Sequence, residues 1–234
     1  MRINSFPVVA EKRTYYKSPK QKKVPREIKR PLYKAIPPEE IYNLGMQTDD
    51  RLARCLLYLT YVTGARISEA VDFTRGDLIL KEKLYRIEMR VAKKRGSAPS
   101  FRLVPIPRGS WSKCQEDAMM EEVTKYINNF DIFQKPFRKW GREEGKGGYM
   151  KIYLRRAFPE VRIMAKIKNE KGIWYDGILQ KPLHAHYLRH CRATHLVDYY
   201  GFSDAQLRAF FTWEKPEMAA RYARFVDVER AFSP

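Results

Sequence analysis

The spacing of the apolar residues changes twice along this chain, and these changes restrict the folds that it can adopt. Helical spacing begins near Pro37, continues through Leu52, Leu56 and Leu59, gives way to alternation over residues 77–106, and then returns. The expected strands are residues 77–80, 84–91 and 101–106. The expected later helices are residues 112–130, 149–166, 184–199, 203–211 and 216–225, and Pro159 must end or kink the helix over residues 149–166. This order predicts an α+β fold that is mainly helical, with a small three-stranded antiparallel sheet.

Residues 1–36 precede this pattern and have no sustained period of their own. They contain eleven Lys or Arg residues and two acidic residues, so they carry +9, and four prolines interrupt them. This composition predicts a flexible basic arm that binds phosphate groups, and a solubilising tail is the alternative. The residues expected to bind the nucleic-acid backbone are Lys20, Lys22, Lys23, Arg26, Lys29 and Arg30, together with Arg95 in the loop 92–100. We expect an arm over residues 1–36 and one folded domain over residues 37–234.

The net charge of the whole chain predicts a polyanionic partner. It is +19 over 234 residues, with a pI near 9.8, which favours nucleic acid first and an anionic membrane surface second. No apolar run approaches the roughly 20 residues of a membrane helix, and the N-terminus lacks the apolar segment of a secretory signal. The three cysteines are widely spaced, which argues against a disulfide framework. We therefore expect an intracellular protein with no membrane partner.

All four histidines fall within twelve residues, at positions 184, 186, 190 and 195. One interpretation is a zinc site, because His186 and His190 are four residues apart on an expected helix. No acidic residue occurs between positions 177 and 197, however, and no second pair of ligands stands out elsewhere. We therefore expect no metal here, and we expect His190 and His195 to pack within the helix.

Four motifs follow one another at defined positions. Residues 63–69 read Thr-Gly-Ala-Arg-Ile-Ser-Glu, and residues 186–190 read His-Tyr-Leu-Arg-His. Lys93 and Lys94 lie between them in the hairpin loop, and Trp213 precedes Tyr222 by nine residues. In this order and over residues 37–225 the sequence resembles the tyrosine recombinase (phage integrase) family. The resemblance implies that the expected α+β fold is the catalytic core of such an enzyme.

The resemblance also implies a role for each matched residue. Arg66 and Arg189 would bind the two non-bridging oxygens of a DNA phosphodiester and stabilise the charge that develops there. Tyr222 would attack the phosphorus and form a covalent 3′-phosphotyrosine, and His186 would assist proton transfer. Trp213 would donate a hydrogen bond to the phosphate, and Lys93 or Lys94 would protonate the leaving 5′-oxygen. Glu69 and His190 would support these groups, and neither a metal nor another cofactor would be needed.

The implied function is that of a site-specific recombinase encoded by a virus or mobile element and associated with DNA in the cytoplasm. Its partner would be double-stranded DNA, on which it would assemble as a homotetramer. In the absence of DNA the protein could be a monomer in solution. A type IB topoisomerase and a recombinase-derived DNA-binding regulator are the alternative functions. The 36 residues before the expected domain are too few for the separate DNA-clamping domain of the family. We therefore expect either a catalytic fragment or a minimal recombinase.

Overall fold

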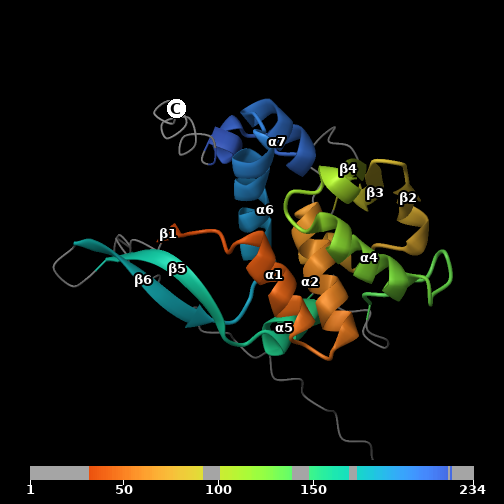
Figure 1. Ribbon diagram of the computed structural model, residues 1–234, viewed down its shortest axis with the longest axis horizontal. Helices are drawn as coiled ribbons and strands as arrows, with labels where there is room; N and C mark the ends of the chain where they lie inside the picture. Colours follow the sequence, from red (N-terminus) through yellow and green to blue (C-terminus); the bar gives the residue numbers. More distant parts are fainter. Residues whose placement is uncertain (1–31, 92–100, 139–147, 169–172, 221, 223–234) are drawn as a thin grey trace, which may run out of the picture. The chain divides into compact units, whose positions relative to one another are not determined.

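The computed structural model describes residues 32–91, 101–138, 148–168, 173–220 and 222, and every statement about the structure refers to these residues (Figure 1). The helices are α1 (Pro38–Met46), α2 (Arg51–Thr63), α3 (Ile67–Ala70), α4 (Glu116–Ile127), α5 (Gly148–Ala157), α6 (Ala185–Tyr200) and α7 (Asp204–Phe211). The strands are β1 (Leu32–Tyr33), β2 (Leu78–Leu80), β3 (Leu84–Arg90), β4 (Phe101–Pro107), β5 (Val161–Lys168) and β6 (Trp174–Lys181), and two short 3-10 turns span Arg75–Asp77 and Gly109–Trp111.

Helix α2 lies at the centre of the helical layer and packs against α1, α4 and α6. The side chain of Asp50 accepts a hydrogen bond from the backbone of Ala53 and so caps the start of the helix. Every residue from Cys55 to Thr63 is buried. The helix ends at Gly64, whose positive φ of 57° allows the chain to reverse direction.

Strands β2, β3 and β4 form an antiparallel sheet in that order, which confirms the three predicted strands. Residues on β3 and β4 are alternately buried and exposed, and Ile87 pairs with Val104 across the inner face. The loop that joins β3 to β4 contains Lys93, Lys94 and Arg95, which lie outside the described residues, as do the six basic residues expected in the arm. The alternation of buried and exposed residues on β3 and β4 is expected where one face of a sheet packs against helices.

A second antiparallel sheet has the strand order β1-β5-β6. Its strand β5 occupies part of the range 149–166, where we expected a helix. Helix α5 ends at Ala157, and β5 begins four residues later, beyond Pro159. Val161, Ile163 and Ala165 are buried while the residues between them are exposed, which is the alternation of a strand. Residues 149–166 therefore contain a helix and then a strand, and the helical interpretation was wrong beyond Ala157.

The short strand β1 belongs to a segment that we call the strap, residues 32–36, which fell within the expected arm. Tyr33 pairs with Ala165 of β5, and the backbone N–H of Lys34 donates a hydrogen bond to the carbonyl of Met164 at 2.9 Å. The hydroxyl of Tyr187 on α6 donates to the carbonyl of Lys34 at 2.5 Å. The strap thus connects the second sheet to α6.

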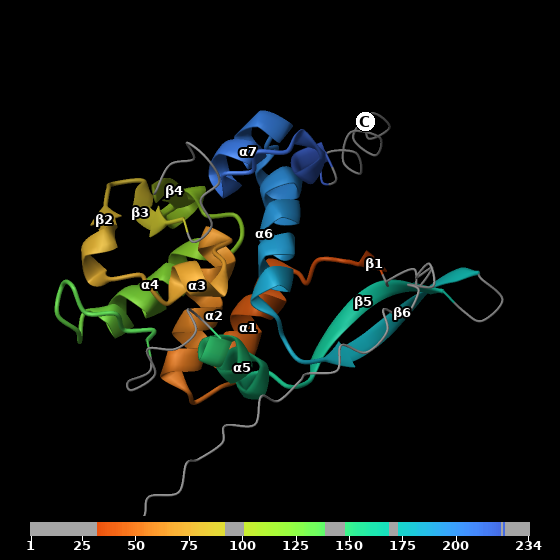
Figure 2. The ribbon, with the colours of Figure 1, turned by 180° about the vertical axis from the view of Figure 1, so that it is seen from behind.

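The helices α2 and α6 lie between the two sheets, as both ribbon views show (Figures 1 and 2). Helix α7 follows α6 directly, and residues 216–220 and Tyr222 are also helical. None of the helices in the described ranges has the length and apolar character that crossing a bilayer would require. The end of α2, the start of α6 and the residues after α7 contain three of the four matched motifs, and the fourth, Lys93 or Lys94, lies outside the described residues.

Candidate active site

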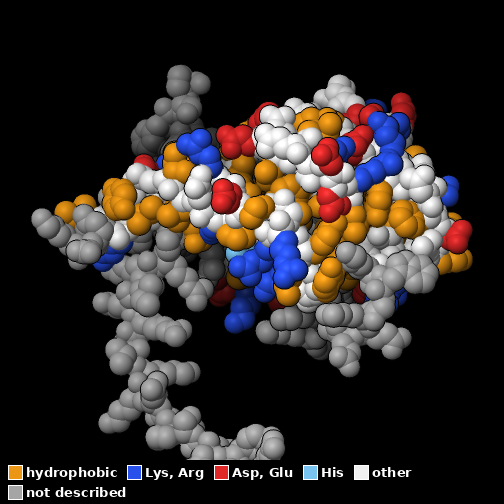
Figure 3. Space-filling model, turned by 90° about the horizontal axis from the view of Figure 1, so that it is seen from below, with side chains coloured by type: hydrophobic (Ala, Val, Ile, Leu, Met, Phe, Trp, Pro, Cys, Tyr) orange, Lys and Arg blue, Asp and Glu red, His pale blue; other side chains and the backbone are white. Residues whose placement is uncertain are grey.

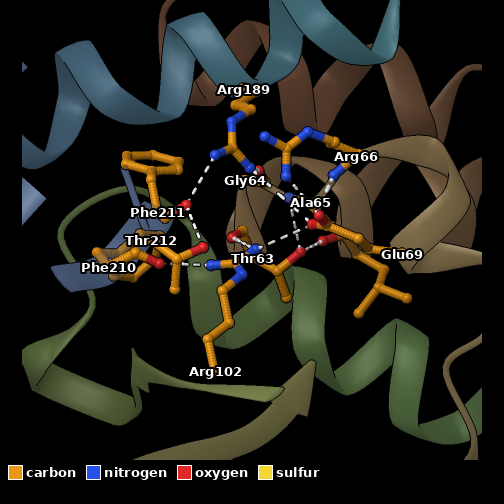
Figure 4. A network of polar contacts seen from close by, with 11 residues as sticks. Thr63, Gly64, Ala65, Arg66, Glu69, Arg102, Arg189, Phe210, Phe211 and Thr212 are labelled. Atoms are coloured by element: carbon orange, nitrogen blue, oxygen red, sulfur yellow. Dashed lines mark hydrogen bonds and ion pairs between the residues drawn. The ribbon is translucent and has the colours of Figure 1, made fainter. Parts of the chain in front are cut away.

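Glu69 is the residue around which the arginines of this region gather (Figure 4). It is buried on α3, and its Oε2 accepts a hydrogen bond of 3.0 Å from the backbone N–H of Arg66. Its Oε1 accepts a second, of 2.7 Å, from the Arg66 guanidinium, which remains 36% exposed. The turn at Gly64 places Arg66 at the start of α3, where a glutamate three residues later can reach back to it.

Arg189 on α6 is almost completely buried and held by two backbone carbonyls. Its Nη1 donates to the carbonyl of Gly64 at 2.6 Å, and its Nη2 donates to the carbonyl of Phe211 at 3.0 Å. The guanidinium also lies 4.6 Å from the centre of the Phe211 ring. Burial, followed by the positive charges of Arg102 and Arg66, lowers the pKa of Arg189 to about 9. It therefore stays charged at neutral pH.

Arg102 is a third arginine at this site and was not among the residues expected from the sequence. Its guanidinium donates to the carbonyls of Phe210 at 2.6 Å and Thr63 at 3.0 Å, and it lies 3.6 Å from Oε2 of Glu69. Burial lowers its pKa to about 10. The sequence contained a signal for it, because Arg102 shares the inner face of β4 with Val104 and Ile106.

Glu69 remains ionised among these three cations. Burial raises the pKa of its carboxyl, but the charge of Arg102, the hydrogen bonds from Arg66 and the charge of Arg189 outweigh burial and hold the pKa below its ordinary value. Figure 4 shows Arg189 and Arg102 approaching the carboxylate from different elements, α6 and β4. One carboxylate thus positions arginines from three separate parts of the chain.

Trp213, Tyr222 and His190 form an aromatic cluster beside the arginines. The rings of Trp213 and Tyr222 are stacked with centres 5.6 Å apart, and Trp213 stacks in turn on Phe211 at 4.5 Å. Nδ1 of His190 lies 3.3 Å from the Tyr222 hydroxyl, and Nε2 lies 3.2 Å from the carbonyl of Tyr33. The histidine that is hydrogen-bonded to Tyr222 is therefore His190, for which we expected packing within the helix and a supporting role, and not the matched His186.

The other histidines lie in different surroundings. His186 is exposed one turn before Arg189, and its pKa is lowered by partial burial and then by the charges of Arg189 and Arg66. His195 is buried, and its Nδ1 lies 2.7 Å from the hydroxyl of Tyr61. Within the described ranges no three His, Cys, Asp or Glu side chains are grouped so that they could hold a metal ion.

Basic side chains also gather on the face that is seen from below, next to a histidine (Figure 3). Helix α5 contributes exposed Lys151, Arg155 and Arg156. Burial of His184 and then the charges of Arg155, Lys181 and Lys151 lower the pKa of that histidine. A positive surface of this kind attracts phosphate.

No family model matches the chain, whereas comparisons with individual proteins do find similar ones. A stretch of 158 residues is 28% identical to the tyrosine recombinase XerD of Bifidobacterium longum (strain NCC 2705), and it covers 66% of this chain and 44% of that protein. The crystal structure of XerA recombinase superposes with a TM-score of 0.55 at 14% identity, over 84% of this chain and 63% of that one. The chain has the tyrosine recombinase fold.

A XerH site-specific recombinase, solved with its difH DNA substrate in a post-cleavage complex, has a TM-score of 0.51 at 16% identity, over 83% of this chain and 50% of that one. These likenesses confirm the predicted resemblance and the predicted fold class. The chain spans less than half the length of the curated relative that it matches. The roles expected for the matched residues stay predictions: Arg66, Glu69, His186, Arg189, His190, Trp213 and Tyr222.

Proposed function

We propose that this chain cleaves and rejoins DNA as a site-specific recombinase, through a covalent 3′-phosphotyrosine and without metal or ATP. The observation that carries the proposal is the geometry around Glu69. Arg66 and Arg189 both contact this carboxylate, at 2.7 and 4.0 Å, and Arg189 also lies 5.6 Å from the ring of Trp213, on which Tyr222 stacks. Two guanidinium groups and a tyrosine hydroxyl are the groups that a metal-free phosphoryl transfer requires.

The two arginines would bind different non-bridging oxygens of the same phosphate. Arg189 is fixed by the carbonyls of Gly64 and Phe211, so it would present its remaining N–H groups to a phosphate without a loss of side-chain entropy. Arg66 is partly exposed and would close on the other non-bridging oxygen. Preorganised donors of this kind stabilise the charge that develops in the transition state.

Tyr222 would attack the phosphorus while its ring is held against Trp213. The bond from phosphorus to the 5′-oxygen would break, and Lys93 or Lys94 would supply the proton for that oxygen. His186, exposed beside Arg189 and Arg66, would donate a hydrogen bond to the phosphate. The indole N–H of Trp213 can only donate, so this residue would bind phosphate rather than transfer protons.

Double-stranded DNA is the proposed partner. The charge of +19 and the basic residues on α5 support phosphate binding. We further propose a tetramer that holds two duplexes, because exchange of strands between two sites requires four cleavages. A virus or mobile element would be the source of such an enzyme, which would act on DNA in the cytoplasm.

A suicide substrate tests the proposal. Because the target site is not known, the probe is a library of nicked duplexes with randomised sequence, from which cleavage releases a short fragment that cannot be rejoined. We expect a denaturant-resistant protein–DNA adduct, its loss in Tyr222→Phe, and its persistence in Tyr175→Phe, a control at a half-exposed tyrosine of β6. An adduct that persists in Tyr222→Phe would place the nucleophile elsewhere.

Two further variants and a chelator complete this test. Arg66→Ala and Arg189→Ala should each slow cleavage by about 10²–10³-fold, as the loss of one oxyanion-stabilising donor does. Cleavage should be unchanged in EDTA. Full activity of either arginine variant would contradict the phosphate-binding assignment, and loss of activity on chelation would contradict the metal-free chemistry.

A further inference from the structure

His190 connects the strap to the hydroxyl of Tyr222. Its Nε2 lies 3.2 Å from the backbone carbonyl of Tyr33 and its Nδ1 lies 3.3 Å from the Tyr222 hydroxyl. The rings of His190 and Tyr222 are also in contact, with centres 5.4 Å apart. One imidazole therefore contacts a fixed acceptor on one side and the candidate nucleophile on the other.

The carbonyl of Tyr33 determines which nitrogen of His190 carries the proton. A carbonyl oxygen can only accept a hydrogen bond, so Nε2 must be the protonated nitrogen. In the neutral ring Nδ1 then has a free lone pair, and the hydroxyl of Tyr222 donates to it. This is the arrangement in which a histidine can remove a proton from a hydroxyl.

We propose that His190 is the base that accepts the proton of Tyr222, and that the carbonyl of Tyr33 holds it in the tautomer that this role requires. The inference rests on the proposed function and goes beyond it, because the resemblance gave proton transfer to His186, whereas the hydroxyl of Tyr222 is hydrogen-bonded to His190. It also makes the strap a part of the catalytic apparatus.

In the proposed step the proton of the Tyr222 hydroxyl moves to Nδ1 of His190 as the oxygen bonds to phosphorus, and the bond from phosphorus to the 5′-oxygen breaks. The 5′-oxygen takes its proton from the lysine of the hairpin loop. The imidazolium keeps its Nε2–H bond to Tyr33, and rejoining reverses each transfer.

The surroundings of His190 keep it neutral and therefore able to act. Burial lowers its pKa, the hydrogen bond to the Tyr33 carbonyl raises it, and the nearby His186 lowers it. The ring of Tyr187, on the same helix, and the ring of Tyr222 have their centres 6.1 and 5.4 Å from that of His190. Lys181 of β6 lies over the rings of Tyr33 and Tyr187.

The strap holds the carbonyl of Tyr33 in place through contacts on both sides. Strand pairing joins Tyr33 to Ala165, and the next residue, Lys34, is hydrogen-bonded to Met164 and to the hydroxyl of Tyr187. The ring of Tyr33 packs edge-on against Tyr187 at 5.9 Å. The base is therefore oriented by a segment that is 157 residues away from it in the sequence.

Two substitutions separate the two hydrogen bonds of His190. His190→Asn retains a polar atom near the position of Nδ1, and His190→Gln retains one near the position of Nε2, but neither amide is basic. We expect single-turnover cleavage of the suicide substrate at pH 7 to fall by about 10²-fold or more in both variants. The control is Glu121→Gln, at an exposed residue of α4, which should cleave at the wild-type rate.

The pH profile distinguishes a base from a merely structural residue. Wild-type cleavage should decrease at acid pH as His190 becomes protonated. In the two variants the deficit should shrink steadily as pH rises, because hydroxide replaces the missing base. A deficit that is constant across pH, or a wild-type rate and profile, would overturn the proposal.

A sulfur-substituted substrate identifies the side of the reaction on which His190 acts. When sulfur replaces the bridging 5′-oxygen, the leaving group needs no proton, so variants of the general acid should recover activity. The His190 variants should remain slow on this substrate. Their recovery would place His190 on the leaving group and would overturn the assignment.

Truncation of the strap tests the role of Tyr33 without changing a side chain of the site, and it decides the matter if the His190 variants do not fold. A chain that begins at Pro31 keeps the Tyr33 carbonyl, whereas one that begins at Lys34 removes it. We expect cleavage to fall at least tenfold in the shorter chain, with DNA affinity unchanged between the two. Equal cleavage would overturn the inference, whereas an adduct in Tyr222→Phe would instead overturn the proposed function.

Discussion

Arg102 shares Glu69 with the two matched arginines, yet its guanidinium is occupied by protein carbonyls. We predict that Arg102→Leu lowers the free energy of unfolding by about 2–4 kcal/mol, because the buried carbonyls of Thr63 and Phe210 each lose a charged donor. Cleavage should also slow, because Glu69 would lose its contact with Arg102 and would hold Arg66 and Arg189 in different positions. Urea unfolding and single-turnover cleavage measure the two effects.

The control for Arg102 is Arg86→Leu, at an exposed arginine of the same sheet. This change should alter stability by less than about 0.5 kcal/mol. If Arg102→Leu were as stable and as active as wild type, the hydrogen bonds seen at Arg102 would have no energetic importance.

His195 gives a prediction for the dependence of stability on pH. Burial, and then the charge of Arg192, lowers its pKa from 6.5 to about 3. In the unfolded chain the imidazole takes up a proton below pH 6.5, while in the folded protein it stays neutral, so stability decreases as pH falls from 6.5 towards 3. The slope from this one group reaches about 1.4 kcal/mol per pH unit.

The matched variant for this prediction is Tyr61→Phe/His195→Leu, which removes both partners of the buried hydrogen bond. Thermal unfolding between pH 7 and 4 should show a shallower loss of stability than in wild type. The loss should not vanish, because the pKa values of His184, His186 and His190 are lowered as well. An unchanged slope would show that His195 is not held neutral.

The sequence contained enough information to find most residues of the candidate site but not their contacts. Arg66, Arg189, Trp213 and Tyr222 stand in recognisable motifs. The hydrogen bond from His190 to Tyr33 could not be predicted, because no local rule relates residues 157 positions apart. Arg102 could have been found, since an arginine among alternating apolar residues on a strand must point towards the core and find acceptors there.

At the scale of elements, the turn between α2 and α3 helps to hold Arg189 in place, because it contains the Gly64 carbonyl to which Arg189 donates. A Cβ at Gly64 would overlap the ring of Phe211, and φ there is +57°. We predict that Gly64→Ala displaces Phe211, so that the Gly64 and Phe211 carbonyls no longer hold Arg189. Cleavage should fall at least tenfold, and the free energy of unfolding should fall by more than the roughly 1–2 kcal/mol of a left-handed alanine.

Gly109→Ala provides the control for this turn, because Gly109 has the same φ of 57° but no atom within 4 Å of the added Cβ. Gly109→Ala should lose only the roughly 1–2 kcal/mol of stability that a left-handed alanine costs, and it should cleave DNA at the wild-type rate. If the two alanine variants behaved alike, the contact between Gly64 and Phe211 would not govern the position of Arg189.

The elements themselves were predictable wherever their pattern was long enough. Strands β2 to β4 follow from alternation bounded by turn residues. Strand β5 has the same alternation, but we assigned it to the helix over residues 149–166, in which we expected Pro159 to produce an end or a kink; the helix in fact ends before Pro159 and a strand follows it. Strand β1 has two residues and exists only because β5 pairs with it, so nothing local could have indicated it.

At the scale of the whole molecule, the charge is concentrated at the N-terminus. Residues 1–30 carry ten basic and two acidic residues. We predict that a chain lacking them binds specific and random duplexes more weakly by similar factors. The slope of log K against log salt should become shallower by several units, because each phosphate contact contributes about −0.9.

This deletion leaves the strap intact, so cleavage of saturating suicide substrate should change little. Fluorescence anisotropy over a range of salt concentrations measures the binding. If the deletion instead removed discrimination between duplexes at a constant salt slope, the arm would read bases or DNA shape, and its description as an electrostatic contact would be wrong.

The charges around Glu69 do not cancel within the described part of the chain. Three guanidinium groups lie within 4.0 Å of one carboxylate, which leaves an excess of two positive charges. On the proposed function a bound phosphodiester would neutralise one of them, and the phosphorane formed by attack, which carries a second negative charge, would neutralise the other. The cluster would then reach electroneutrality only at the transition state, and the mutual repulsion of its arginines would be relieved in the step that breaks the DNA strand.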